Sequence, residues 1–85
     1  MLNVTCGAGA VPGRQTFFCD SSNRLISVTC SFDRGPPEMC EFPLVVGIGR
    51  FGTDNHTVDV TVVDVFGQLL NLSFDFRLVE RKPHI

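Results

Sequence analysis

Leu70-Asn71-Leu72-Ser73-Phe74-Asp75-Phe76-Arg77-Leu78 carries the clearest structural pattern in this chain. Apolar and polar residues alternate strictly along it, and a period of two is the pattern of a strand with one buried face. The segment 57–62 before it alternates in the same way, with valines on one face and Thr or Asp on the other. Between the two segments lies Gly67, which can adopt a positive φ in a turn. We therefore expect the two segments to form an antiparallel hairpin.

Four further segments have strand patterns, and each is bounded by turn-forming residues. In the segment 26–32, Ile26, Val28, Cys30 and Phe32 alternate with small hydroxyl residues, and the sequence Asp-Arg-Gly-Pro-Pro closes it as a turn. We also expect strands at 2–6, at 16–19 and at 42–48, the last with Leu44, Val46 and Ile48 facing inward. Residues 7–13 are expected to form a flexible link, and residues 49–55 a loop.

These segments predict a β-sandwich, because short strands with turn signals roughly every eight to twelve residues are typical of that architecture. The chain has eight Phe but no Trp or Tyr, so its aromatic rings bring apolar area with no polar group to satisfy. A single open sheet would leave the Phe-rich strand faces exposed, whereas two packed sheets bury them. At 85 residues there is room for one domain, which we expect over residues 1–80, with 81–85 as a C-terminal linker.

The four cysteines, Cys6, Cys19, Cys30 and Cys40, predict two disulfides rather than a metal site. No pair has the C-x-x-C spacing of zinc or redox sites, and neither His56 nor His84 lies at a ligand-like spacing from a cysteine pair. Four cysteines allow three connectivities, and their spacing alone does not choose among them.

Three N-x-[ST] sequons, at Asn3, Asn55 and Asn71, are candidate glycosylation sites. Together with the even number of cysteines they favour an extracellular location, either secreted or in an ectodomain. No apolar run reaches the length of a membrane span, so we expect no direct membrane insertion in this segment. No signal peptide precedes Asn3, and we expect the export signal elsewhere in the native protein. The formal net charge of −2 argues against a nucleic-acid partner.

Three carboxylates recur at five-residue spacing, at Asp54, Asp59 and Asp64, and could suggest a calcium site. Calcium needs about six to eight converging oxygen ligands, whereas an odd spacing along a strand turns successive side chains to opposite faces. We therefore expect no metal or other cofactor. Asp64 is instead expected to accept backbone N–H groups in the hairpin turn.

His56 is a candidate catalytic or pH-sensing imidazole. No serine elbow, H-E-x-x-H motif or partnered Cys–His arrangement accompanies it. Residues 47–52 match the G-x-G-x-x-G fingerprint of dinucleotide-binding loops, but we expect neither the helix nor the βαβ unit that the fingerprint requires. We therefore expect His56 to open a strand and the chain not to be an enzyme.

Arg50 and Phe51 form the most plausible binding feature, because an arginine beside an aromatic on a loop has the composition of an interface hot spot. The alternative is that Phe51 folds back to cap the open end of the core while Arg50 stays solvated. Hot spots are few among surface residues, which favours this alternative.

Residues 30–44, with the sequence CSFDRGPPEMCEFPL, resemble a C-S-[LF]-D-x-G-P…C-x-x-P-L pattern of Ig-like β-sandwich repeats in large extracellular proteins. Residues 56–68, which begin with His-Thr and end with Asp-Val-Phe-Gly-Gln, resemble the second signature of those repeats, which hyalin-type and PKD-type modules share. The chain departs from the pattern at Arg34, where Gly is frequent, and at Gln68, where Asn is usual.

The resemblance implies an Ig-like antiparallel β-sandwich of six to seven strands, in which Cys30 pairs with Cys40 and Cys6 then pairs with Cys19. Each bridge would add roughly 2–3 kcal/mol on the loop-entropy model. The implied function is a non-catalytic structural or adhesive module that spaces adjacent domains of an extracellular or cell-surface chain, with possible protein contacts. One alternative is a ligand-binding ectodomain that uses the loop 49–55. Another is a small secreted inhibitor or toxin that presents residues 7–15 as a disulfide-tied loop.

Overall fold

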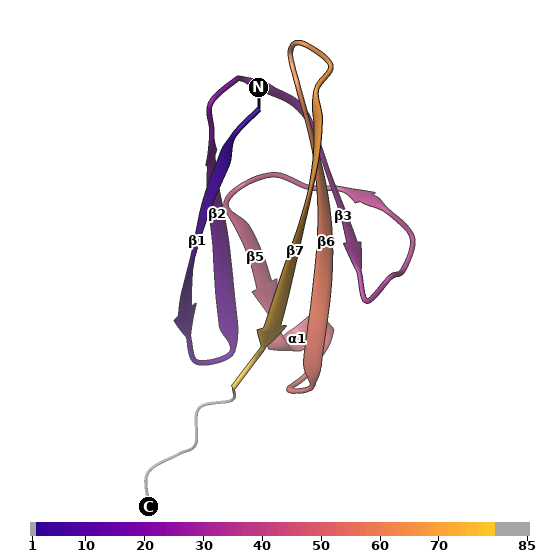
Figure 1. Ribbon diagram of the computed structural model, residues 1–85. Helices are drawn as coiled ribbons and strands as arrows, with labels where there is room; N and C mark the ends of the chain where they lie inside the picture. Colours follow the sequence, from indigo (N-terminus) through magenta and orange to yellow (C-terminus); the bar gives the residue numbers. More distant parts are fainter. Residues whose placement is uncertain (1, 80–85) are drawn as a thin grey trace, which may run out of the picture.

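The computed structural model describes residues 2–79, in which two antiparallel sheets pack face to face (Figure 1). The first sheet has the strand order β1-β2-β5 and the second the order β4-β3-β6-β7. The elements are β1 (Val4–Val11), β2 (Arg14–Ser21), β3 (Leu25–Phe32), β4 (Glu38–Met39), β5 (Leu44–Gly47), α1 (Ile48–Phe51), β6 (Asn55–Asp64) and β7 (Leu69–Arg77). The fold is an all-β sandwich, as the alternating segments predict. The predicted domain boundary at residue 80, the linker 81–85 and His84 lie outside the described residues.

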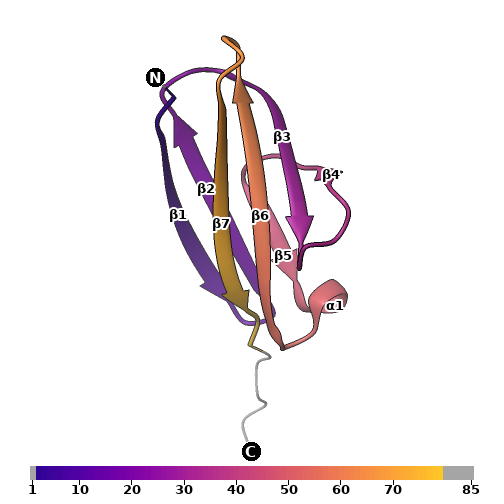
Figure 2. The same ribbon diagram turned by 45° about the vertical axis from the view of Figure 1, so that its right-hand side comes forward.

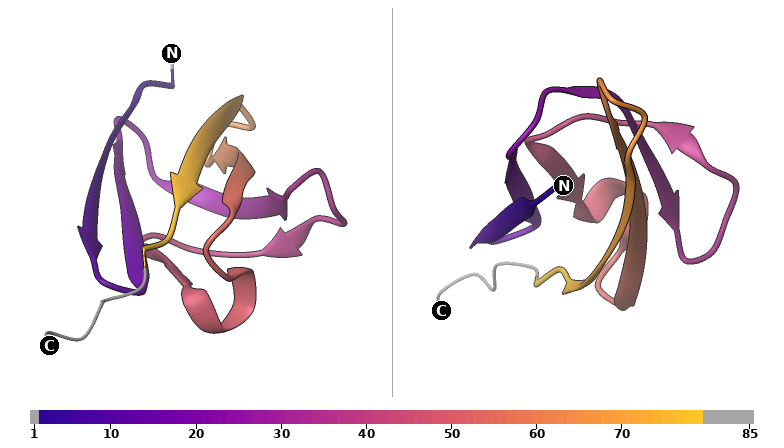
Figure 3. Two further views of the ribbon diagram at one scale, coloured as in Figure 1. Left: turned by 90° about the horizontal axis from the view of Figure 1, so that it is seen from below. Right: turned by 45° about the horizontal axis from the view of Figure 1, so that its top comes forward.

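Most of the strand pairings match those of an immunoglobulin-type sandwich. Lettered in chain order as A, B, C, C′, E, F and G, the strands form the sheets A-B-E and C′-C-F-G. Immunoglobulin constant domains also pair B with E, C with F and F with G, but they carry the fourth strand on the edge of the other sheet. Here β4 pairs instead with β3, through Thr29 opposite Met39 and Cys30 opposite Glu38. Seen along the strands, β1 and β2 lie to one side of β6 and β7 (Figure 3).

The core lies between the two sheets and is built from the alternating faces of their strands. In β6 and β7 every expected apolar position points inward, and Val60 lies opposite Cys30 on one side and Leu72 on the other. Phe17 of β2 connects the sheets, because its ring stacks on Phe74 at 4.9 Å between centroids. The buried apolar residues are Leu2, Phe17, Cys30, Leu44, Val46, Val58, Val60, Val62, Phe76 and Leu78.

Residues 7–13 are not a flexible link, and that prediction is wrong. β1 continues through Val11 and pairs with β2 along its whole length, and Pro12 and Gly13 form the turn, with Gly13 at φ 79°. The small residues of this segment carry no readable period, but the backbone ladder to β2 holds them extended. The segment 7–15 is therefore part of a strand hairpin.

Two further predicted positions differ in the structure. Ile26 is 64% exposed, because a register shift between Leu25 and Ser27 interrupts the alternation and Leu25 packs against the core instead. Ile48 begins α1 rather than ending a strand, and its backbone N–H donates to the Gly13 carbonyl at 2.9 Å.

Both disulfides have the connectivity that the family resemblance implies. Cys6 and Cys19 lie directly opposite each other in the β1–β2 ladder, with their Cα atoms 4.1 Å apart. Cys30 joins β3 to Cys40, the residue that follows β4, across a Cα–Cα distance of 5.9 Å. Two disulfides in so small a domain are consistent with an oxidising compartment.

Candidate functional site

One end of the sandwich carries a group of charged and aromatic side chains that we call the end cluster: Asp33, Glu38, Arg50, Phe51 and His56. They come from the turn after β3, from β4, from α1 and from the beginning of β6. Figure 2 shows α1 at this end, beside the end of β3 and the beginning of β6. The turn after β3 is tight, because Asp33 and Arg34 both adopt left-handed backbone conformations, at φ 52° and 60°.

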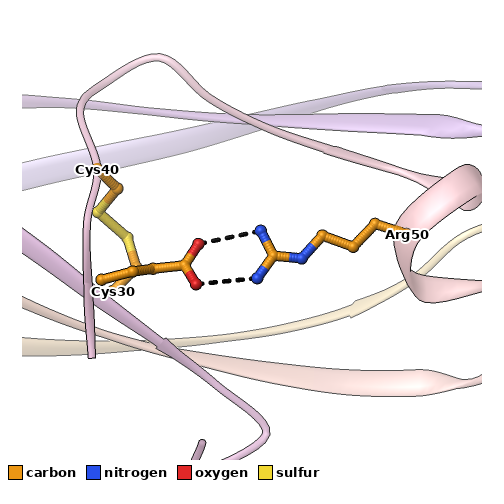
Figure 4. Close-up of a disulfide and its surroundings, with 4 residues drawn as sticks. Cys30, Cys40 and Arg50 are labelled. Atoms are coloured by element: carbon orange, nitrogen blue, oxygen red, sulfur yellow. Dashed lines mark hydrogen bonds and ion pairs between the residues drawn. A yellow bond between two sulfur atoms is a disulfide. The ribbon is translucent and has the colours of Figure 1, made fainter. Parts of the chain in front are cut away.

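Arg50 is tied to Glu38 and does not project freely into solvent. Its two terminal nitrogens donate to the two carboxylate oxygens of Glu38 at 3.0 and 2.9 Å, the dashed contacts beside the Cys30–Cys40 disulfide in Figure 4. The guanidinium also lies over the rings of Phe32 and Phe51, 4.8 and 5.0 Å from their centroids. The hydrogen bonds from Arg50 lower the pKa of Glu38, and those to Glu38 raise the pKa of Arg50.

Phe51 folds back onto the core, as the second interpretation of this loop predicts. Its half-buried ring lies 4.9 Å from the ring of Phe32 and meets Phe76 edge-on at 5.3 Å. Arg50 stays solvated, as the same interpretation predicts, with 58% of its side chain exposed, and it also forms the ion pair with Glu38. Arg50 and Phe51 thus make their ion pair and ring contacts with residues of the module itself, whereas in an interface hot spot such contacts are made with a partner.

His56 connects three parts of the end cluster. Its Nδ1 lies 2.6 Å from Oδ2 of Asp33, and its Nε2 lies 2.6 Å from the backbone carbonyl oxygen of Phe51. The ring stacks on Phe76 at 5.5 Å. The hydrogen bond to Asp33, followed by that to Phe51, raises the pKa of His56. The pKa of Asp33 is lowered, first by the backbone N–H of Thr57 and then by His56.

The three acidic residues weighed as calcium ligands do not converge. Asp54 and Asp59 are exposed, whereas Asp64 is fully buried. Asp64 accepts backbone N–H groups from Phe66 at 3.0 Å and from Gln68 at 2.8 Å, which confirms its predicted role in the hairpin turn. Among residues 2–79, no group of three or more His, Cys, Asp or Glu side chains is placed to hold a metal ion.

The three sequon asparagines are exposed and belong to different parts of the chain. Asn3 precedes β1, Asn55 is the first residue of β6, and Asn71 is the third residue of β7. Asn71 points to the outer face of its sheet, where its Oδ1 accepts a hydrogen bond from Thr61 Oγ1 at 2.9 Å. The Nδ2 atom, to which a glycan would be attached, thus belongs to an outward-facing side chain.

The G-x-G-x-x-G match at 47–52 does contain a helix, which the sequence pattern did not lead us to expect. The helix is α1, a single turn of four residues, and it connects β5 to β6, which lie in different sheets. The dinucleotide fingerprint requires a βαβ unit with parallel strands. No helix within residues 2–79 has the length and apolar character to cross a membrane.

Sequence reasoning singled out Arg50, Phe51 and His56 but missed their acidic partners, Asp33 and Glu38. Neither acid forms a motif with its partner, since the chain between them passes through β5 and α1. The one available signal was the pair of acids flanking the Arg-Gly-Pro-Pro turn. Comparison of the chain with protein-family models, with curated proteins and with solved structures finds no match.

Proposed function

We propose that this chain is a non-catalytic structural module of a multidomain extracellular or cell-surface protein, in which it holds neighbouring domains apart at a fixed spacing. The polar groups of the end cluster bind one another, so their hydrogen-bonding capacity is used within the module. The proposal therefore rests on the shape of the module rather than on a reactive site.

The observation that carries the proposal is the direction of the first and last strands. β1 and β7 run the same way, so the chain enters β1 at one end of the sandwich and leaves β7 at the other (Figure 1). A domain joined to the beginning of β1 and a domain joined to the end of β7 would thus be separated by the full length of the sandwich. The chain just after β7 is also anchored, because the Val79 carbonyl accepts the Gly13 N–H at 2.7 Å.

Three further features support the extracellular part of the proposal. Both disulfides are formed, and the described part of the chain holds no free cysteine. All three sequon asparagines lie at the surface, where glycans can be accommodated. The resemblance of residues 30–44 and 56–68 to Ig-like repeats points to the same setting, with adhesion through protein contacts as a related role.

The spacing role is tested by placing the chain between donor and acceptor fluorescent proteins in one secreted polypeptide. Time-resolved energy transfer then measures the distribution of distances between them, not only the mean. A rigid spacer gives a narrow distribution, whereas a flexible Gly/Ser linker of equal length behaves as a random coil and gives a broad one. The Gly/Ser fusion serves as the matched control. A distribution as broad as that of the control would overturn the proposal.

A further inference from the structure

The surroundings of His56 can be fully satisfied only by the protonated ring. A neutral imidazole has one N–H donor and one acceptor nitrogen, whereas the imidazolium has two donors. Both ring nitrogens of His56 face acceptors at 2.6 Å, an Asp33 carboxylate oxygen and the Phe51 carbonyl oxygen. The carbonyl cannot donate, and an ionised carboxylate cannot donate either. A neutral His56 would therefore direct one nitrogen lone pair at an oxygen lone pair.

The carboxylate decides which of the two contacts is lost. An ionised Asp33 favours a proton on Nδ1, since hydrogen bonds to a charged acceptor are the stronger ones. The Asp33 carboxylate is fixed in place, because its other oxygen accepts the Thr57 N–H at 3.0 Å. In the neutral ring Nε2 would then carry the lone pair, opposite the carbonyl of Phe51, the last residue of α1.

We propose that His56 is a proton-operated latch that holds α1 against the start of β6, closed when the imidazole is protonated and released when it is neutral. Release breaks the contact to the Phe51 carbonyl and frees the ring of Phe51 from its place over Phe32 and Phe76. The end of the module that carries α1 thus has a closed form at mildly acidic pH and a looser form at higher pH.

The charges around the latch are arranged to keep it closed at low pH. Asp33 contacts the ring directly, and Asp54, in the turn after α1, also favours the protonated form. On β7, Asp75 and Arg77 line the same open hollow as His56. These two side chains carry charges of opposite sign. The imidazole is 16% exposed, so protons can reach it.

The Arg50–Glu38 pair does not release together with the latch. The pKa of Glu38 is lowered and that of Arg50 is raised, so both stay charged across the range in which an imidazole titrates. α1 would then remain attached to β4 on one side while its contact with β6 opens. We expect a local loosening of α1, including its hydrogen bond from Gly52 to Ile48, and not unfolding of the sandwich.

The latch is tested by NMR on the His84→Gln variant, in which His56 is the one remaining histidine of the chain. The NMR chemical shifts of the two imidazole nitrogens report both the protonation state of the ring and the tautomer of its neutral form. Titration between pH 5 and 9 should give a midpoint above the ordinary histidine value of about 6.5, with the proton of the neutral ring on Nδ1. Exchange of the Gly52 amide, which bonds to the Ile48 carbonyl in α1, should accelerate through the same midpoint.

A second variant separates the latch from a simple charge effect. Asp33→Asn presents an amide to Nδ1, so a neutral ring can accept there and still donate from Nε2 to Phe51. This variant should lower the pKa of His56 and keep α1 closed up to pH 9. Amide exchange also rises with pH because hydroxide catalyses it. The His56→Gln variant has no imidazole at this position, so it measures this contribution to Gly52 exchange by itself.

Two results would overturn the latch. One is a His56 titration midpoint at or below that of an unperturbed histidine. The other is Gly52 exchange that follows the same pH dependence in the parent protein and in the Asp33→Asn variant.

Discussion

The ring of Phe18 lies across the backbone of Gly7, the residue directly opposite it in the β1–β2 ladder. A Cβ atom added to Gly7 would come within 2.6 Å of the ring carbon Cε2. The glycine therefore gives an exposed aromatic ring a flat surface to lie on, in an edge strand that would otherwise be weakened by its small residues.

Gly7→Ala is accordingly expected to have opposite effects in two backgrounds. In the parent protein the new methyl displaces the Phe18 ring and lowers stability. In the Phe18→Ala variant the ring is absent, and the alanine should stabilise the strand by about 0.5–1 kcal/mol, because it has less backbone entropy to lose. Gly9→Ala is the control, since a Cβ there meets nothing within 4 Å and should stabilise both backgrounds. Urea unfolding of the double-mutant cycle measures the coupling, and additive effects would contradict this account.

Phe17 and Phe18 are neighbours in sequence with opposite roles, since Phe17 is 3% exposed and Phe18 is 51% exposed. Phe17→Ala should cost about 3–5 kcal/mol, a large share of the stability of a small domain. Phe18→Ala should cost less than about 1 kcal/mol. Equal losses in chemical denaturation would mean that the strand faces are assigned incorrectly.

The two disulfides should contribute unequally to stability. Each closes a short loop and should add roughly 2–3 kcal/mol by restricting the unfolded chain. We expect the larger loss when Cys30 and Cys40 are both replaced by Ala, because Cys30 is fully buried and the bridge fastens the two-residue strand β4. Cys6 and Cys19 join strands that are already paired along their length. A larger loss for the Cys6/Cys19 double variant, measured by urea unfolding, would reverse this order.

Asp64 should make the module sensitive to acid. Burial of this carboxyl raises its pKa, but hydrogen bonds from Asn23, Gln68 and Phe66 outweigh the burial and hold the pKa below its ordinary value of 3.8. A carboxyl with a lowered folded-state pKa contributes stability above its unfolded-state pKa, and this contribution is lost as the pH falls through the folded-state value. Thermal unfolding between pH 2 and 6 should therefore show a loss of stability at the acid end.

The control for this prediction is Asp64→Asn, which keeps the shape of the side chain but sets its amide against that of Asn23. This variant should be less stable than the parent at pH 6 and should lose less stability on acidification. If the variant lost as much stability at low pH as the parent protein does, the acid sensitivity would come from other carboxyl groups.

The alternation in 57–62 and 70–78 was sufficient to predict β6, β7 and the hairpin between them, because each strand has one buried face. The second half of β1 could not be predicted in this way, since its Gly and Ala residues leave no pattern on either face. The exposure of Ile26 could not be predicted for another reason. A bulge changes the register of the strand without any local sequence signal.

The end cluster was predictable only in part. An arginine beside an aromatic was recognisable as unusual, but its contact with Glu38 arises from the way β4 and α1 approach each other in space. The same is true of His56 and Asp33, which are brought together by the pairing of β3 with β6. Pairings of this kind depend on tertiary structure, and a single sequence does not display them.

The most direct test of the account is a disulfide and glycan map of the chain produced in a secretory host. Non-reducing peptide mapping by mass spectrometry should find Cys6 linked to Cys19 and Cys30 linked to Cys40, with a glycan on at least one of the three sequon asparagines. Free thiols in a stably folded protein, or a crossed link such as Cys6 to Cys40, would contradict both the strand arrangement and the extracellular module that we propose.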